Sequence, residues 1–87
     1  MFSKEATITN QVGLYARPAT FFIQKANEFR STILIDKDDR KVNAKSLLGV
    51  LSLGITKGSV ITISAEGADE EEAVNALCNL IASNFGE

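Results

Sequence analysis

The chain has 87 residues, of which 45% are hydrophobic, and its formal net charge is −2. This length allows one domain with a single core, and the weakly negative charge argues against direct nucleic-acid binding. No signal peptide or long apolar run is present, which predicts neither secretion nor membrane insertion. The single cysteine, Cys78, cannot form an internal disulfide and fits a reducing, cytoplasmic compartment.

Alternation of apolar and polar residues predicts a half-buried strand over residues 2–9. After a loop over residues 10–15, apolar residues recur at spacings of three and four and predict a helix from Arg17 to Glu28. Phe21 falls outside the apolar stripe of this helix and is interpreted as partner surface. The stripe itself consists of Ala19, Phe22, Ile23, Ala26 and Phe29.

The start of this helix is a candidate anion site. Pro18 is predicted at the first helical position, where its missing N–H costs nothing. The free N–H groups of the following turn and the positive end of the helix dipole favour an anion. Arg17 adds a fixed positive charge, and Tyr15 lies on the loop directly before the helix. Taken alone, the pattern also fits an ordinary strand-to-helix turn.

A hairpin is predicted next, with strands over residues 32–37 and 40–43. Asp38 and Asp39 supply its two-residue turn. A fourth strand is predicted over residues 59–66. The basic residues of this middle region suit contact with acidic partners or a phosphate, although each one taken separately also fits solvated surface. These residues are Lys37, Arg40, Lys41, Lys45 and Lys57.

The short helix between the hairpin and the fourth strand is the second candidate site. It is predicted over residues 47–53, with Ser46 as N-cap and Gly54 after its end. Its apolar residues are too many for the buried face of two turns, so some are expected in solvent, where apolar clusters often mark binding sites. The alternative, in which all of them are core, stays open. The residues are Leu47, Leu48, Val50, Leu51 and Leu53.

The last helix is predicted to begin at Asp69, with Glu72 placed for a capping box. The acidic residues of its first turn are interpreted as helix-start electrostatics and not as a metal site. Cys78 is interpreted as packing, because no histidine or second cysteine is available to support chemistry. The sequence therefore predicts no metal and no cofactor.

The element order β-α-β-β-α-β-α predicts one two-layer α+β domain over residues 1–87, with helices on one face of a sheet. The outer face of each strand is polar, which favours antiparallel pairing. The loop over residues 10–15 could serve as a hinge for exchange of the first strand between chains. A monomer and a strand-exchanged dimer therefore both stay open.

Three segments together resemble the HPr family, the histidine-containing phosphocarriers of the bacterial sugar phosphotransferase system. Residues 13–19, Gly-Leu-Tyr-Ala-Arg-Pro-Ala, are similar to the active-site motif of that family, and residues 45–54 to its regulatory serine segment. Residues 57–70 resemble its last strand and the entry to its last helix. The resemblance covers nearly all of the chain and implies an open-faced sandwich with a four-stranded antiparallel sheet and three helices on one face.

The resemblance also assigns roles to residues. The family carries its phosphoryl group on a histidine at the position of Tyr15, but this chain contains no histidine. A phenol, with a pKa near ~10 against ~6.5 for imidazole, is a poor replacement, and phosphotyrosine is a stable ester. Tyr15 and Arg17 are therefore interpreted as a degenerate phosphocarrier site. Ser46 matches the regulatory serine, which implies phosphorylation by HPr kinase/phosphorylase with ATP.

A retained serine with a lost histidine resembles the Crh branch of the family. This branch implies a non-enzymatic regulator of carbon catabolite repression, whose serine-phosphorylated form binds a LacI-type catabolite control protein as corepressor. Crh carries glutamine at the position of Tyr15, so the branch stays open. One alternative is an HPr-type phosphotransferase component, degenerate or still docking to Enzyme I. Another is a binding module for an unrelated partner that needs no phosphorylation.

The predicted partner surface combines the first helix with the short helix. It requires the starts of the two helices to lie close together, as the resemblance implies. No nucleic acid or membrane is expected among the partners. The surface residues are Arg17, Thr20, Phe21, Gln24, Leu47, Leu48 and Leu51.

Overall fold

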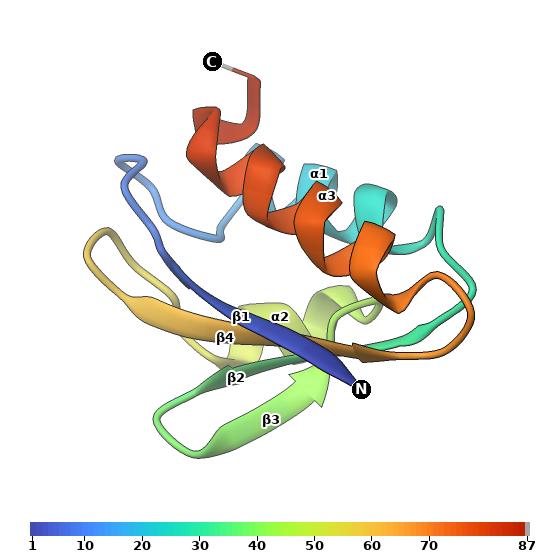
Figure 1. Ribbon diagram of the computed structural model, residues 1–87. Helices are drawn as coiled ribbons and strands as arrows, with labels where there is room; N and C mark the ends of the chain where they lie inside the picture. Colours follow the sequence, from blue (N-terminus) through green and yellow to red (C-terminus); the bar gives the residue numbers. More distant parts are fainter. Residues whose placement is uncertain (87) are drawn as a thin grey trace.

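An antiparallel sheet carries helices on one face in the computed structural model, which describes residues 1–86 (Figure 1). Residue 87 of the predicted domain lies outside the described residues. The element order predicted from the sequence is confirmed, with one added 3-10 turn, η1, at Asn84–Gly86. The elements are β1 (Phe2–Thr7), α1 (Arg17–Ala26), β2 (Thr32–Lys37), β3 (Arg40–Asn43), α2 (Leu47–Ser52), β4 (Val60–Glu66) and α3 (Glu70–Ala82).

The four strands form one sheet in the order β1-β4-β2-β3, and all neighbours are antiparallel. The register places Ala6 opposite Ile61, and Ile35 opposite Ile63. Because side chains alternate across a strand, this pairing puts the apolar residues of neighbouring strands on the same face. The register therefore follows from the alternation in the sequence.

The core lies between this apolar face and the two longer helices, α1 and α3 (Figure 1). Phe22 of α1 and Leu77 of α3 are fully buried. Removing a side chain of this size from water contributes roughly 1.5–3 kcal/mol to stability. The sheet supplies Ile33, Ile35, Ile61 and Ile63, all without solvent exposure.

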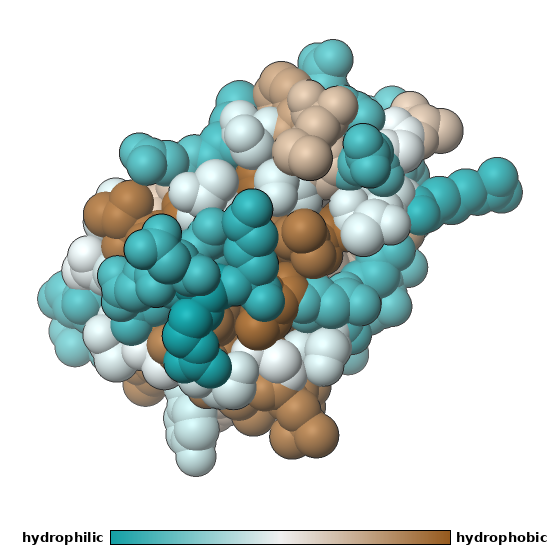
Figure 2. Space-filling view, turned by 90° about the horizontal axis from the view of Figure 1, so that it is seen from below, coloured by the Kyte–Doolittle hydropathy of each residue, from teal (hydrophilic) through white to brown (hydrophobic). Residues whose placement is uncertain are grey.

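The opposite face of the sheet carries no helix. Figure 2 views this face and shows mostly polar side chains with smaller apolar areas between them. Val60, an outward residue of β4, is a large apolar side chain of this face and is 53% exposed. The other paired outward residues of β1 and β4, including Glu5 and Thr62, are polar. This arrangement explains the one-sided alternation of the strands.

The turn of the hairpin has the conformation that a two-residue connection requires. Asp38 and Asp39 both have positive φ, at 52° and 66°. Two consecutive left-handed residues characterise the type I′ turn, whose twist matches that of the flanking strands. The predicted turn is therefore confirmed and its type is settled.

The first helix begins at its predicted residue but ends two residues early, and its proline lies one position later in the helix than predicted. It begins at Arg17, so Pro18 occupies the second helical position instead of the first. It ends at Ala26, before the predicted Glu28, and the Asn27 side chain bonds the carbonyl of Ile23 at 2.9 Å. An asparagine that bonds the backbone locally competes with the helical ladder, which accounts for the earlier end.

The predicted capping box at the start of α3 is wrong. Asp69 occupies the N-cap position, but its carboxylate does not bond the helix. It accepts instead from the backbone N–H groups of Arg30 and Ser31, each at 2.9 Å, and from the Ser31 hydroxyl. Glu72 is exposed. Asp69 thus ties the start of α3 to the segment between α1 and β2.

These hydrogen bonds favour the charged carboxylate. The bond from the Ser31 hydroxyl, followed by that from the Arg30 N–H, lowers the pKa of Asp69 from 3.8 to about 2. A lowered pKa in the folded state stabilises the fold above the unfolded pKa, and this contribution disappears as the pH falls through the folded value.

Asp69→Asn should therefore lower the urea midpoint at neutral pH, and its difference from wild type should shrink as the pH falls from 3.8 towards 2. Urea unfolding followed by circular dichroism over that range measures this. Glu72→Gln, at an exposed acid of the same turn, is the matched control and should show little change. A difference that stays constant over the whole range would contradict the assigned role.

Candidate functional site

Two neighbouring residues, Gly13 and Leu14, attach the loop before α1 to the backbone of Ile55. Gly13 has φ +66°, and a Cβ at this position would lie 2.2 Å from the carbonyl oxygen of Ile55. The Leu14 N–H donates to the same oxygen at 3.1 Å, and its side chain is buried. Only glycine permits this approach. With Leu14 pointing inwards, Tyr15 is left 66% exposed.

The turn into α1 is strained. Ala16, at the N-cap position, has φ 56° and ψ −128°, a combination that costs a non-glycine residue on the order of 1–3 kcal/mol. It offers no side-chain cap to the first helical N–H groups, and its carbonyl accepts from the N–H of Thr20 at 3.1 Å. The start of α1 therefore has no side-chain cap on its first N–H groups, and the anion site there stays a prediction.

An open hollow of about 530 Å³ lies beside this helix start. Arg17 lines the hollow, and its guanidinium lies 5.5 Å from the ring centre of Phe21. Tyr15 is not among the lining residues, so the structure does not bring its phenol into the hollow with Arg17. The other lining residues are Thr9, Asn10, Gln11, Val12, Ala16, Pro18 and Asn84.

Asn84 is the residue here that sequence reasoning missed. Its side-chain oxygen accepts from the Thr9 hydroxyl at 3.0 Å, which joins the C-terminal turn to the loop after β1. The two residues are 75 positions apart. No local pattern signals such a contact, because it depends on where the fold places the end of α3.

The second site is the start of α2. Ser46 has an extended backbone, and its hydroxyl oxygen accepts from the Gly49 N–H at 3.1 Å, which confirms the predicted N-cap. A Cβ on residue 49 would lie 3.3 Å from that hydroxyl oxygen, tighter than most real Cβ contacts. The glycine that weakens the helix thus makes room around the serine hydroxyl.

Lys45, the residue before this serine, already forms a hydrogen bond within the fold. Its ammonium donates to the carbonyl of Phe29 at 2.7 Å, and the residue is half-buried. The neighbouring positive charge is therefore directed to the end of α1. It anchors the start of α2 against the rest of the fold.

The apolar residues of α2 divide between core and solvent. Val50 and Leu53 are buried, whereas Leu47 is 43% and Leu48 is 81% exposed. Leu51 is half-buried. The alternative in which all five are core is wrong, because the helix is too short to bury every side.

The expected proximity of the two helix starts is also wrong. Lys45, before α2, contacts Phe29, after α1, while Ile55, after α2, contacts Leu14, before α1. The two helices are in contact, and these contacts between opposite ends indicate that they run in opposite directions. Arg17 and Ser46 therefore lie at opposite ends of the helix pair, and the exposed residues Leu47 and Leu48 directly follow Ser46.

On α1, the predicted surface residues follow helical spacing. Arg17, Thr20 and Gln24 are exposed, and Phe21 is half-buried against the core. Phe21 is thus less accessible than the sequence predicted. Positions three and four apart lie on one side of a helix, so these four residues share one stripe.

Residues 1–86 offer neither a cluster of metal ligands nor a membrane-spanning helix. No three side chains of histidine, cysteine, aspartate or glutamate gather closely enough there to hold a metal ion. Over the same residues, no helix combines the length and apolar character needed to span a membrane.

Comparison with known proteins agrees with this architecture. The family model described as the PTS HPr component phosphorylation site matches residues 2–83. The chain is 51% identical over 81 residues to the HPr-like protein Crh of Halalkalibacterium halodurans, covering 93% of this chain and 96% of that protein. It is 42% identical over 87 residues to the phosphocarrier protein HPr of Neisseria meningitidis, covering 100% and 98%.

Among solved structures, the crystal structure of HPr-C-His from Thermoanaerobacter tengcongensis has a TM-score of 0.99 and 53% sequence identity, covering 100% of this chain and 98% of that one. Fold and family match together define a domain of the phosphocarrier class. More particularly, the chain belongs to the HPr family, and its relatives include both HPr and the HPr-like protein Crh.

Proposed function

We propose that this member of the HPr family is a regulatory phosphoprotein of carbon catabolite repression, switched by phosphorylation of Ser46. The observation that carries the proposal is a capped, accessible serine on an HPr fold that has no histidine to act as carrier. The 51% identity to an HPr-like protein Crh supports the regulatory role. The protein acts by binding and is not an enzyme, and it works in the cytoplasm.

The start of α2 suits a phosphorylated serine. Ser46 already accepts from Gly49 and, through its carbonyl, from Val50 at 2.9 Å. Within residues 1–86 this leaves the N–H groups of Leu47 and Leu48 for a phosphoryl group. A phosphoryl group there also gains from the positive end of the helix dipole. The donor is ATP, and the enzyme is HPr kinase/phosphorylase.

The downstream partner is a LacI-type catabolite control protein, which binds the phosphorylated form. Its contact surface combines Leu47, Leu48 and Leu51 with the exposed stripe of α1, because the two helices contact one another even though their starts lie apart. A surface that includes both exposed leucines and an arginine resembles the mixed apolar and charged composition of binding surfaces. The stripe on α1 consists of Arg17, Thr20, Phe21 and Gln24.

Ser46→Ala tests the switch. It should abolish ATP-dependent labelling by HPr kinase/phosphorylase and should cost about 1 kcal/mol of stability, because the helix loses its cap. Intact-protein mass spectrometry and urea unfolding measure the two effects. Ser52→Ala, at the other end of α2, is the control and should keep full labelling. Undiminished labelling of the Ser46→Ala protein would place the modified residue elsewhere.

Leu48→Asp tests the surface. Leu48 is 81% exposed, so the change should alter stability by only about 0.5 kcal/mol, and an acid is tolerated near a helix start. Binding of the phosphorylated protein to the LacI-type partner should weaken roughly tenfold or more, as measured by calorimetry. Val60→Asp, at an exposed apolar residue on the outer sheet face, is the matched control. Equal binding by both variants would exclude α2 from the interface.

A second candidate function is that of a phosphotransferase component that still docks to Enzyme I. The 42% identity to a phosphocarrier HPr over the whole chain favours it, as does the open helix start beside Arg17. In this candidate the scaffold is retained and only the nucleophile at Tyr15 is lost.

Tyr15→His tests that candidate. The variant should recover partial, acid-labile labelling from phosphoenolpyruvate through Enzyme I, because imidazole is nucleophilic near neutral pH and the exposed loop tolerates the change. Wild type should remain unlabelled. If a folded variant that is still phosphorylated at Ser46 takes no label, the docking surface itself has been lost.

A further inference from the structure

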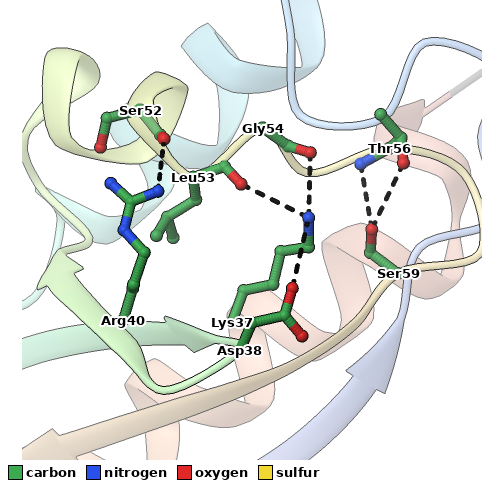
Figure 3. Close-up of polar contacts among 8 residues, drawn as sticks. All are labelled: Lys37, Asp38, Arg40, Ser52, Leu53, Gly54, Thr56 and Ser59. Carbon is green, nitrogen blue, oxygen red and sulfur yellow. Dashed lines mark hydrogen bonds and ion pairs between the residues drawn. The ribbon is translucent and has the colours of Figure 1, made fainter.

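Two cations of the β2–β3 hairpin bind the carbonyl groups at the end of α2 (Figure 3). Arg40 Nη1 donates to the carbonyl oxygen of Ser52 at 3.1 Å. Lys37 Nζ donates to the carbonyl oxygens of Gly54 at 3.1 Å and Leu53 at 3.4 Å. Lys37 and Arg40 are directly opposed across the hairpin, so both reach the helix from the same side of the sheet.

The last four carbonyl groups of a helix have no partner within the helical ladder. In α2, three of them accept from donors of the same segment: Gly49 from the Ser52 hydroxyl at 2.6 Å, Val50 from the Leu53 N–H at 3.2 Å, and Leu51 from the Gly54 N–H at 3.2 Å. The fourth, Ser52, accepts from Arg40. The hairpin thus supplies the hydrogen-bond donor for the one terminal carbonyl group that has no donor within the segment itself.

These contacts matter because α2 has little helical stability of its own. It has six residues, one of them glycine, and a helix this short is not stable in isolation. Val50 is the only residue of the helix that is buried within the described part of the chain. Stability must therefore come from attachments at the ends, and cations at a helix C-terminus also favour its dipole.

The position of the two cations is fixed by the structure of the hairpin. The Lys37 side chain is only 21% exposed, and its ammonium lies 3.8 Å from the carboxylate of Asp38. Asp38 belongs to the type I′ turn that fixes the hairpin register. At the other end of α2, Lys45 bonds the carbonyl of Phe29. The helix is tethered at both ends by lysine.

We infer that Lys37 and Arg40 are positioning residues for the Ser46 switch, which hold α2 folded before any modification. A phosphoryl group on Ser46 then meets a preformed helix start and does not have to fold one. This inference rests on the proposed phosphorylation of Ser46, but the holding of α2 is a property of the unmodified protein and is measurable separately.

The coupling runs through the helix and not directly between charges. Six residues span about 9 Å, which is comparable to the Debye length of roughly 8–10 Å at physiological salt. Direct attraction between the cations and a phosphoryl group at the far end is therefore reduced by screening. The cations at one end of α2 and the phosphoryl group at the other both act on the same equilibrium between formed and open helix. Each of them shifts this equilibrium towards the formed state.

The first experiment uses the full, unmodified chain. In Lys37→Met/Arg40→Met, hydrogen exchange followed by NMR should show faster exchange of the Val50, Leu53 and Gly54 amides, by about tenfold, with less than about a twofold change in β4. Methionine keeps the apolar stem and removes the donors. Lys41→Met, on the same strand and not bonded to α2, should leave exchange unchanged.

The conservative pair Lys37→Arg/Arg40→Lys should restore slow exchange, because both cations are kept. Two results would overturn the inference. Unchanged amide exchange in α2 would show that the two cations do not stabilise the helix. An equal increase in α2 and β4 would show general destabilisation and no specific hold on the Ser46 segment.

The second experiment compares wild type and the methionine double variant after treatment with HPr kinase/phosphorylase and ATP. Phosphorylation should slow α2 exchange by a similar factor in both proteins, because each end of the helix lowers its opening equilibrium independently, and the phosphorylated double variant should still exchange faster than phosphorylated wild type. Unchanged α2 exchange in both phosphorylated proteins would contradict an equilibrium shared by the two ends of the helix. If neither protein is phosphorylated, the proposed function fails, while the first experiment still decides whether the cations hold α2.

Discussion

The close contact between Gly13 and the carbonyl of Ile55 fixes both candidate sites at once. Gly13 belongs to the loop before α1, and Ile55 follows α2. Because nothing larger than hydrogen fits between them, the two segments lie backbone to backbone, and the Leu14 N–H completes the contact with a hydrogen bond. The exposure of Tyr15 and the orientation of α2 are therefore consequences of one packed junction.

The features that the sequence predicted correctly depend on neighbours along the chain. Alternation identified the strands, helical spacing identified α1, and the pattern of a serine followed by apolar residues identified the α2 cap at Ser46. The Asp38-Asp39 turn is equally local. In each case the physical cause, side-chain periodicity or a bond across three residues, lies within a few positions, so the sequence displays it directly.

The features that it missed depend on distant partners. Asp69 looks like a helix cap by position, but its carboxylate finds better donors 38 and 39 residues earlier. The basic residues of the middle region looked available for acidic partners, whereas Lys37, Arg40 and Lys45 are each bonded to backbone carbonyls. Only the fold shows which charges are already engaged, because their partners come from other elements.

The two faces of the sheet differ, because helices cover one of them and the other is exposed to solvent. Both candidate sites belong to the helices and their loops, while Val60 is an exposed outward residue of β4 on the opposite face of the sheet. A chemical tether or a fluorescent dye attached at Val60 would therefore leave the helices clear. Immobilised through this face on a sensor chip, every copy would present α1 and α2 to the passing solution in the same orientation.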